Sequence, residues 1–217
     1  MWGNFPESVQ ATIKKLEIIM EEIKMGLYKY LKEAWKSPRK NILKGSMRNS
    51  VIEWRKQPST VRILRPTRLD KARSLGYRAK QGILIVRQKV NRGGRMTEQV
   101  AGGRRSKRQS RRKDLNQSYQ TIAEQRAASK FTNCEVLNSY YVAEDGHNYW
   151  YEIILVDKEH PAIKNDKTLS WITKPKANQR VKRGLTSSAK KSRGLRNKGI
   201  GSEKARPSQA ANGNRLK

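Results

Sequence analysis

The stretch VLNSYYVAEDGHNYWYEIILVD, residues 136–157, decides the fold. Two segments rich in tyrosine and β-branched residues, 136–142 and 149–157, flank Glu144-Asp145-Gly146. β-branched and aromatic residues favour strands, and an Asp-Gly pair between two such segments is typical of a hairpin turn. The stretch therefore predicts an antiparallel β-hairpin against which the rest of the chain packs.

Two further strands are predicted upstream of the hairpin. Residues 60–64 are short and rich in β-branched side chains, and residues 83–90 follow a glycine and alternate between two faces. One face of the second strand is apolar, whereas the other carries Arg87 and Lys89. That basic face is either exposed to solvent or in contact with RNA, and the sequence leaves the choice open.

Proline positions bound the helices predicted before the first strand. Residues 27–36 end before Ser37-Pro38, and a helix over residues 46–55 ends before Pro58. The residue that precedes a proline avoids helical backbone, so both prolines stop a helix. Within residues 1–24, apolar side chains recur at helical spacing between Lys and Glu, which predicts an amphipathic helix.

Capping residues define two helices closer to the hairpin. Thr67 is expected to cap a helix over residues 68–75, and Gly76 stands where a glycine commonly ends one. Asp114 is expected to cap a second helix, with Gln117 at its third position completing a capping-box arrangement.

Together these elements predict an α+β fold with a small, mostly antiparallel sheet of about four strands, packed helices and long basic extensions. We expect one small core between residues 60 and 172. The predicted organisation comprises an N-terminal extension at 1–24, a basic helical arm at 25–59, an α+β core at 60–173 that contains a basic loop at 91–113, and a basic C-terminal tail at 174–217.

The composition is strongly basic. Among 217 residues, 49 are Lys or Arg and 18 are Asp or Glu, a formal net charge of +31. The charge is clustered, since residues 91–113 hold nine basic residues against one acidic, and residues 174–217 hold fourteen against one. Such a chain repels itself when compact unless a polyanion neutralises it, which favours a nucleic-acid partner. Folded RNA suits long arms that order on binding better than a DNA duplex does.

Several other classes of protein are disfavoured. Cys134 is the single cysteine, so it forms no intrachain disulfide, and with His147 and His160 it cannot complete a four-ligand zinc site. The longest apolar runs have four residues, far below the roughly 20 that span a bilayer. The first residues lack the uncharged segment of a secretory signal, so we expect a cytoplasmic protein without cofactor or small-molecule substrate.

The titratable residues offer little for catalysis. Glu144 and Asp145 are adjacent but lie in the predicted turn, where carboxylates are mostly solvated. Cys134 with His147 or His160 can form a thiolate pair in principle, but a small buried cysteine, an exposed turn histidine and a histidine that caps a local turn are the stronger interpretations. Phosphate-binding glycine loops of the Walker type are absent from the sequence.

Basic side chains are the strong chemical signal, because Lys and Arg neutralise phosphates and Arg also binds them through two parallel hydrogen bonds. Aromatic residues of the hairpin are expected in the core, whereas Trp35, Trp54 and Tyr77 lie among basic residues and are candidates for stacking on bases. The predicted RNA-binding residues are Lys36, Trp54, Arg55, Arg62, Arg65, Arg68, Arg73, Arg78, Lys80, Arg92, Arg95, Arg104, Arg105, Lys107, Arg108, Arg111, Arg112, Lys113, Lys174, Arg183, Lys190, Lys191, Arg193, Arg196 and Lys198.

Eight blocks of the sequence, in this order, resemble one protein family. They are MGLYKYL (25–31), EWRKQP (53–58), RPTRLDKAR (65–73), LGYRAKQG (75–82), RGGR (92–95), VLNSY (136–140), WITKP (171–175) and RGLTS (183–187). The chain is similar, from residue 25 to about residue 199, to the eukaryotic-type large-subunit ribosomal protein fifteen, a family of archaea and eukaryotes.

The resemblance implies a structural component of the large ribosomal subunit, located on the cytoplasmic ribosome. Its partners would be large-subunit rRNA and neighbouring ribosomal proteins, with no membrane contact and no catalytic role. The family pattern begins at Met25, so our hypothesis for residues 1–24 is an upstream start assignment that ribosome binding does not need.

Two other functions stay open at this point. One is a non-ribosomal RNA-binding or RNA-processing protein, which as an enzyme would need an acid–base pair or a metal cluster. The other is a membrane-surface protein that uses residues 9–23 as an interfacial helix, although acidic residues in that stretch suit anionic lipid poorly.

Overall fold

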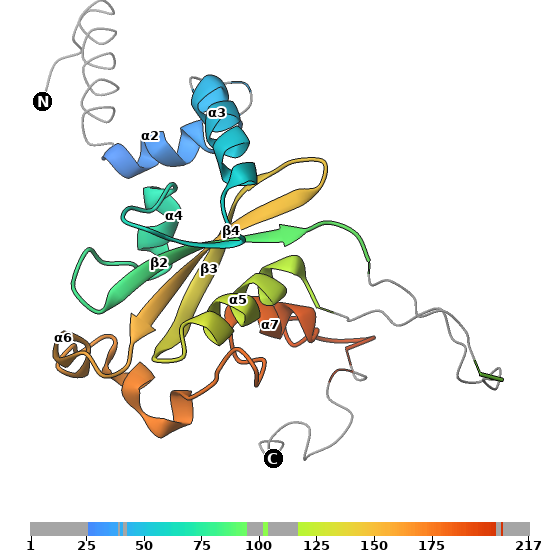
Figure 1. Ribbon diagram of the computed structural model, residues 1–217. Coiled ribbons are helices and arrows are strands. Elements are labelled where there is room, and N and C mark those ends of the chain that lie inside the picture. The colour runs from blue at the N-terminus through green and yellow to red at the C-terminus, as the bar shows by residue number, and fades with distance from the viewer. Residues whose placement is uncertain are drawn as a thin grey trace, which may run out of the picture.

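A computed structural model of the chain describes residues 26–38, 40, 43–94, 102–103, 117–202 and 205. A four-stranded antiparallel sheet lies at its centre (Figure 1), in the order β1-β2-β4-β3. The strands are β1 (Thr60–Ile63), β2 (Ile83–Asn91), β3 (Cys134–Glu144) and β4 (Asn148–Asp157). The predicted α+β class, with about four mostly antiparallel strands and packed helices, is confirmed.

The hairpin of β3 and β4 forms where the sequence predicts it. In the turn, the Asp145 carboxylate accepts hydrogen bonds from the backbone N–H groups of His147 at 2.8 Å and Asn148 at 2.6 Å. The Asp145 side chain therefore stabilises the turn through hydrogen bonds to its backbone. The register shifts between Val136 and Asn138 and again further along β3, so strict alternation of buried and exposed residues does not hold on this strand.

The expectation of a solvated or RNA-facing basic side for β2 is wrong. β2 is an inner strand, and both of its faces are covered. Arg87 is 9% exposed, with its guanidinium 4.2 Å from the ring centroid of Trp54 and donating to the Gln57 side-chain carbonyl at 2.8 Å. Lys89 donates to the backbone carbonyls of Arg55 and Gln57. Both cations are therefore bound within the protein by residues 54–57.

Six α-helices and two 3₁₀ segments are described. The α-helices are α2 (Leu27–Ala34), α3 (Leu43–Lys56), α4 (Leu69–Ser74), α5 (Tyr119–Lys130), α6 (Pro161–Lys164) and α7 (Ser187–Ser192), and the 3₁₀ segments are η2 (Ser170–Thr173) and η3 (Pro175–Ala177). The predicted helices at 27–36, 46–55 and 68–75 correspond to α2, α3 and α4, with ends that differ by up to three residues. α6, the two 3₁₀ segments and α7 were not predicted.

Two predicted N-caps are wrong. Thr67 does not cap α4, because its N–H, at 3.0 Å, and its hydroxyl both donate to the buried carboxylate of Glu152. α5 begins at Tyr119 and not near Asp114, and its cap is Ser118, whose hydroxyl accepts from Thr121 N–H at 3.3 Å. The predicted end of α4 is confirmed, since Gly76 directly follows its last turn with a φ of +101°.

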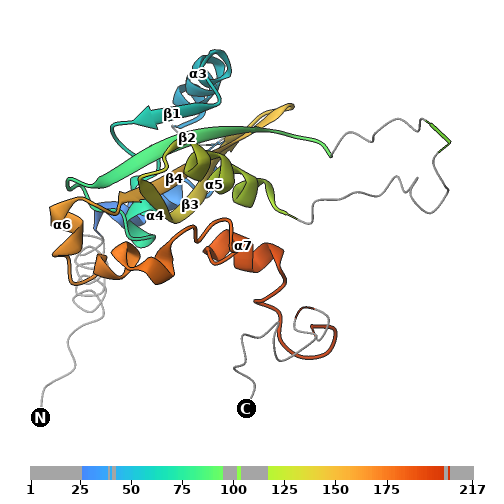
Figure 2. The same ribbon diagram turned by 60° about the horizontal axis from the view of Figure 1, so that its bottom comes forward.

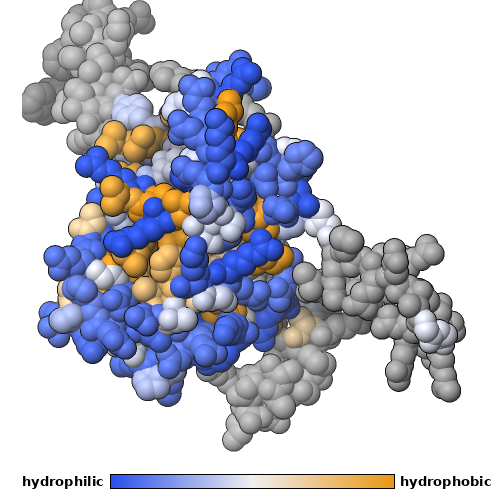
Figure 3. Space-filling view, viewed as in Figure 1, coloured by the Kyte–Doolittle hydropathy of each residue, from blue (hydrophilic) through white to orange (hydrophobic). Residues whose placement is uncertain are grey.

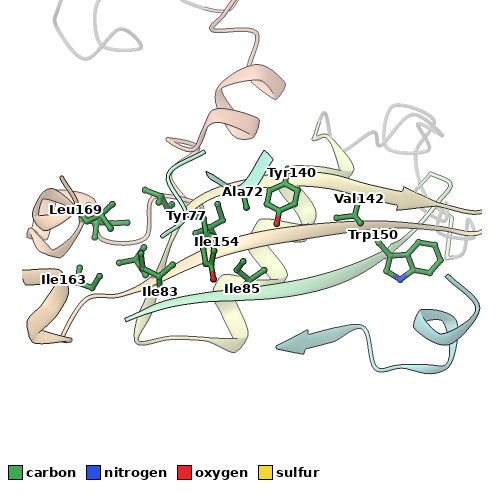
Figure 4. Close-up of a cluster of buried hydrophobic side chains, with 14 of the residues drawn as sticks. Ala72, Tyr77, Ile83, Ile85, Tyr140, Val142, Trp150, Ile154, Ile163 and Leu169 are labelled. Atoms are coloured by element: carbon green, nitrogen blue, oxygen red, sulfur yellow. The ribbon is translucent and has the colours of Figure 1, made fainter. Parts of the chain in front are cut away.

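The sheet separates two hydrophobic clusters, so the prediction of one small core is also wrong. On one side, α3, α4, α6 and η2 cover a cluster that includes Trp54, Ala72, Tyr77, Ile83, Ile85, Tyr140, Trp150, Ile154, Ile163 and Ile172 (Figure 4). On the other side, α5 covers a cluster that includes Val86, Ala123, Ala127, Val136, Ile153, Leu155 and Val181. Sheet residues alternate between the clusters, which explains why β2 and β4 are buried on both faces.

Part of the segment that begins at residue 174 packs on the folded core, with Ala177 in the first cluster and Val181 in the second. Ala177, Val181 and Ala189 are at most 5% exposed, and α7 lies beside α5 in both views (Figures 1 and 2). Few but well-spaced apolar residues suffice to anchor it. The predicted features at residues 1–24 and at Leu115, and most of the predicted basic loop, lie outside the described residues. Along the part of the chain that is described, no helix is both long and apolar enough to cross a bilayer.

Candidate nucleic-acid interface

Hydrogen bonds fix the first root of the basic loop, at residues 92–94, to the folded core. Arg92 donates its backbone N–H to the His147 carbonyl at 2.7 Å and its guanidinium to the Asp145 carbonyl at 2.8 Å. Gly93 exchanges two hydrogen bonds of 3.0 Å with the Tyr119 hydroxyl. The loop therefore leaves the sheet beside the first residue of α5.

The second root is fixed next to the first one. Ser118, which caps α5, donates its N–H to the Ser192 hydroxyl of α7 at 3.1 Å. The hydroxyls of Ser118, Thr121 and Ser192 are also within 3.2 Å of one another. Both roots of the intervening loop are thus attached around the start of α5.

Aromatic rings pack beside the two loop roots. The rings of Tyr119 and Tyr149 stack with centroids 4.9 Å apart, and the Arg92 guanidinium lies 4.8 Å from the centroid of Tyr149. Burial and the neighbouring tyrosines raise the pKa of Tyr151 to about 12, so its hydroxyl stays neutral. The rings form a rigid, uncharged floor beside a basic rim.

Two adjoining hollows run along this region, and we call them together the basic groove. The first, of about 850 Å³, lies between the loop roots and is bordered by Arg92, Arg126 and Lys191. The second, of about 770 Å³, shares Gln117 and Ser192 with the first and is bordered by Lys182, Arg183 and Arg193. None of the described residues that line either hollow is acidic. A uniformly positive groove favours a polyanion that follows it.

A third hollow has a different character. It lies between α3 and the end of the hairpin and has a volume of about 510 Å³. Most of its lining residues are apolar, but Glu144 and Asp145 also line it. The Arg55 guanidinium pairs with Asp145 at 2.8 Å there. Hydrogen bonds from Arg55 and the turn N–H groups outweigh partial burial and hold the pKa of Asp145 below its ordinary value. Its mixed charge makes this hollow a poor phosphate site.

A buried carboxylate holds the C-terminal wall of the basic groove. Glu124 of α5 is 1% exposed and accepts hydrogen bonds from the hydroxyls of Thr186 and Ser188, each at 2.6 Å, and from Ser139 of β3. Thr186 also caps α7, since its hydroxyl accepts from Ala189 N–H. One carboxylate thus joins α5, β3 and α7, and fixes the backbone that carries the α7 cations.

Most of the predicted RNA-binding cations that are described lie at the surface. Exposed residues are Lys36, Arg55, Arg62, Arg65, Arg73, Arg78, Arg92, Lys174, Arg183, Lys190, Lys191, Arg193, Arg196 and Lys198. Arg68 and Lys80 are half-buried and pair with Asp70 and Asp166. The remaining candidates lie outside the described residues: Arg95, Arg104, Arg105, Lys107, Arg108, Arg111, Arg112 and Lys113. Contact with RNA stays a prediction for all of them.

The structure brings only some of these cations together. Arg92, Arg183, Lys191 and Arg193 meet along the basic groove, although 101 positions separate the first from the last along the chain. Others, such as Lys80 beside α6, lie elsewhere. On the face shown in Figure 3, hydrophilic residues cover the periphery and hydrophobic residues gather towards the middle.

The stacking prediction for Trp35, Trp54 and Tyr77 is wrong, because each side chain is at most 9% exposed. Trp54 lies between Arg87 and Trp150, and Arg68 covers Trp35 at 4.9 Å. Cations therefore stack on these rings within the protein. The core assignment of the hairpin aromatics is confirmed for Tyr140, Trp150 and Tyr151, whereas Tyr141 is 39% exposed.

Two groove residues were missed. Arg126 and Lys182 border the groove but were not among the predicted residues. Arg126 lies in a stretch of balanced charge, so segment sums gave no signal for it. Its position seven residues after Tyr119 on α5, two helical turns along the same side, would have indicated it had the start of α5 been predicted correctly.

The structure offers little for acid–base chemistry. Burial raises the pKa of the Cys134 thiol, which disfavours its thiolate, and His147 is exposed in the turn. His160 caps α6 as expected, its Nδ1 accepting from Ala162 N–H at 3.2 Å. Glu152 is fully buried, and burial raises its pKa despite hydrogen bonds from Thr67 and Tyr140. Within the described part of the chain, no three His, Cys, Asp or Glu side chains form a metal-binding group.

Comparison with known proteins gives this fold a family. The model of the family described as Ribosomal L15 matches residues 26–212, which include both loop roots and the whole basic groove. The chain belongs to this family. Its similarity to the Ribosomal L15 family, predicted above from eight blocks, is thereby confirmed, and the matched region begins one residue after Met25.

Two curated relatives of this Ribosomal L15 chain come from archaea. "Large ribosomal subunit protein eL15" of Methanospirillum hungatei is 52% identical over 193 residues, which are 88% of this chain and 98% of that protein. The protein of the same name from Methanocella arvoryzae is 52% identical over 191 residues, 88% of this chain and 97% of that protein. Both are therefore similar to this chain over nearly their full lengths.

Proposed function

We propose that this chain is a structural constituent of the large ribosomal subunit that binds rRNA through its basic groove and basic extensions, on the cytoplasmic ribosome. Membership of the Ribosomal L15 family and the names of its two relatives support the ribosomal role. The observation that carries the RNA-binding part is the basic groove, where six cations from three separate stretches of chain border one continuous surface without an acidic neighbour among the described lining residues.

Charge explains why rRNA is the partner that this fold fits. The net charge of +31 includes three acidic residues, Glu124, Glu135 and Glu152, that are buried and hydrogen-bonded inside the protein. These carboxylates hold the fold together and contribute little to the outer surface. The solvent-facing part of the chain is thus even more basic than its sequence suggests, and binding to phosphates releases their counterions.

A structural role also agrees with the chemistry of the buried groups. Glu152 and Glu124 accept hydrogen bonds on both carboxylate oxygens and are at most 1% exposed, so they cannot reach a substrate. We therefore expect no turnover of RNA by the purified protein. We also expect neighbouring ribosomal proteins as partners, and neither a membrane nor a small-molecule substrate.

The test is the salt dependence of binding to a transcript of the cognate large-subunit rRNA, measured by filter retention. Log affinity should fall by about 0.7–0.9 for each neutralised phosphate per log unit of salt, so a groove that binds several phosphates gives a steep slope. The double variant K182Q/K191Q removes two exposed cations that border the groove. Its matched control, K164Q/K167Q, removes two exposed cations near α6.

We expect the groove variant to flatten the slope by about 1.5 and the control to leave it nearly unchanged. Affinity that does not depend on salt would contradict binding through phosphates. Equal loss in both variants would show that total charge, and not the basic groove, governs binding.

A further inference from the structure

The half of the basic groove between the loop roots differs from the other half. Its lining combines the rings of Tyr119 and Tyr151 and the side chain of Ile122 with the cations Arg126 and Lys191. Among the described residues, none that lines the adjoining half is aromatic. We call this first half the aromatic hollow. A site that contacts phosphates alone needs no rings, so its apolar side calls for a ligand that also has an apolar, planar part.

The size and openness of the aromatic hollow suit such a ligand. Its volume of about 850 Å³ lies within the range of roughly 300–1,000 Å³ typical of sites for small organic groups. Gly93 and Gly94 border it, and a Cβ atom built on either glycine would have no heavy atom within 4 Å. Backbone without side chains therefore leaves an entrance on the side from which the loop departs.

The hollow is also rigid. Tyr119 is held by its hydrogen bonds to Gly93 and by its stacking on Tyr149, and the opposite wall is held by Ser118, Ser188 and Ser192. A preformed site loses little freedom when a ligand binds, and aromatic rings beside cations are the usual means by which proteins bind unpaired bases.

We propose that the aromatic hollow holds one unpaired nucleotide of the bound RNA, with its base against Tyr119 and Ile122, which are half-buried, and its phosphate between Arg126 and Lys191. The inference rests on the proposed function and deepens it. An RNA backbone that follows the basic loop passes this entrance, because both loop roots border the hollow. Paired nucleotides cannot enter, since their bases are stacked within a helix.

The experiment uses the full chain bound to a transcript of the cognate large-subunit rRNA. Ultraviolet irradiation links bases covalently to side chains in direct contact, and mass spectrometry of the digested complex then identifies peptide–nucleotide adducts. We expect an adduct on the peptide that contains Tyr119. In R126Q/K191Q, the yield of that adduct should fall at least about fivefold, because the two cations that bind the phosphate of this nucleotide are removed. Both substituted residues are exposed, so the fold is retained.

The matched control is K164Q/K167Q, which removes the same charge near α6 and should leave the adduct at its original yield. Adducts on other peptides but none on the peptide with Tyr119 would overturn the inference and leave the proposed function intact. An equal fall in both variants would overturn the assignment of Arg126 and Lys191 to the site. Absence of both adducts and filter retention would overturn the proposed function and this inference with it.

Discussion

Glu124 should be the side chain on which the C-terminal wall of the basic groove depends, and its replacement tests the structure most directly. E124A removes a buried carboxylate that accepts three hydroxyl hydrogen bonds from Ser139, Thr186 and Ser188. A hydrogen bond to a charged group contributes about 1.5–3 kcal/mol, so the three together amount to roughly 5–9 kcal/mol.

Two effects reduce that sum. The hydroxyls of Thr186 and Ser188 are 3.4 Å apart, and Ser188 is 3.3 Å from that of Thr121, so they re-pair in part when the carboxylate is gone. Removing a buried charge also recovers its desolvation cost. We therefore expect E124A to lower the free energy of unfolding by about 3–5 kcal/mol, and E124Q by about 1–2 kcal/mol because an amide still makes hydrogen bonds.

Urea unfolding of the full chain in high salt, followed by tryptophan fluorescence, measures the effect. With a slope of about 2–3 kcal/mol per molar, E124A should lower the midpoint by about 1.5 M. The control is E159A at an exposed residue, with an expected change within about 0.5 kcal/mol. Relative to wild type, E124A should accelerate amide hydrogen exchange more in residues 181–193 than in β2. A loss below about 1 kcal/mol for E124A would refute the network as the anchor of α7.

Three further predictions concern single residues. G82A should lower the free energy of unfolding by about 2 kcal/mol or more, because Gly82 has a φ of +83° and a Cβ there would lie 2.6 Å from a side-chain atom of Ile163. The control is G146A, because a Cβ at Gly146 would have no heavy atom within 4 Å. Equal midpoints of urea unfolding for the two variants would contradict the strain at Gly82. Burial raises the pKa of Glu152 in the folded state, so the folded protein binds this proton more tightly than the unfolded chain, and the free energy of unfolding falls as pH rises above about 4.5. E152Q should remove this contribution to the dependence of the free energy of unfolding on pH. Parallel pH profiles of the two proteins would contradict it. Asp145 has a lowered pKa in the folded state, so the stabilisation by its carboxylate is present above the ordinary aspartate range and is lost as pH falls through the folded pKa. The difference in the free energy of unfolding between wild type and D145N should therefore shrink on acidification. A constant difference would show that the ion pair with Arg55 contributes nothing.

Local sequence carried the prediction of those elements whose signals are themselves local. The hairpin of β3 and β4, the glycine that ends α4 and the capping role of His160 each depend on residues adjacent in the chain, and the structure confirms them. The predictions failed where a distant partner competed for the same group. Thr67 has the right chemistry for a helix cap, but its hydroxyl donates to Glu152, 85 residues away.

The candidate site shows the same limit. Charge counting indicated the basic segments and placed Arg92, Lys191 and Arg193 among the candidates, but counting treats every cation as equivalent. The sequence predicts Arg87 on a face exposed to solvent or to RNA, whereas in the structure Trp54 covers it. Arg126 was overlooked because its own segment has balanced charge, although the fold puts it at the groove.

By itself, the amino-acid sequence determined the class of fold, the excess of positive charge and the resemblance to a ribosomal family, because composition, turn residues and ordered motifs are properties of the chain alone. Tertiary structure decided which cations share a surface, which aromatic rings are accessible, and that part of the predicted basic C-terminal tail packs on the core, with Val181 in the second cluster and Ala189 buried. These outcomes depend on contacts between residues tens of positions apart, and such contacts exist only once the sheet has brought the segments together.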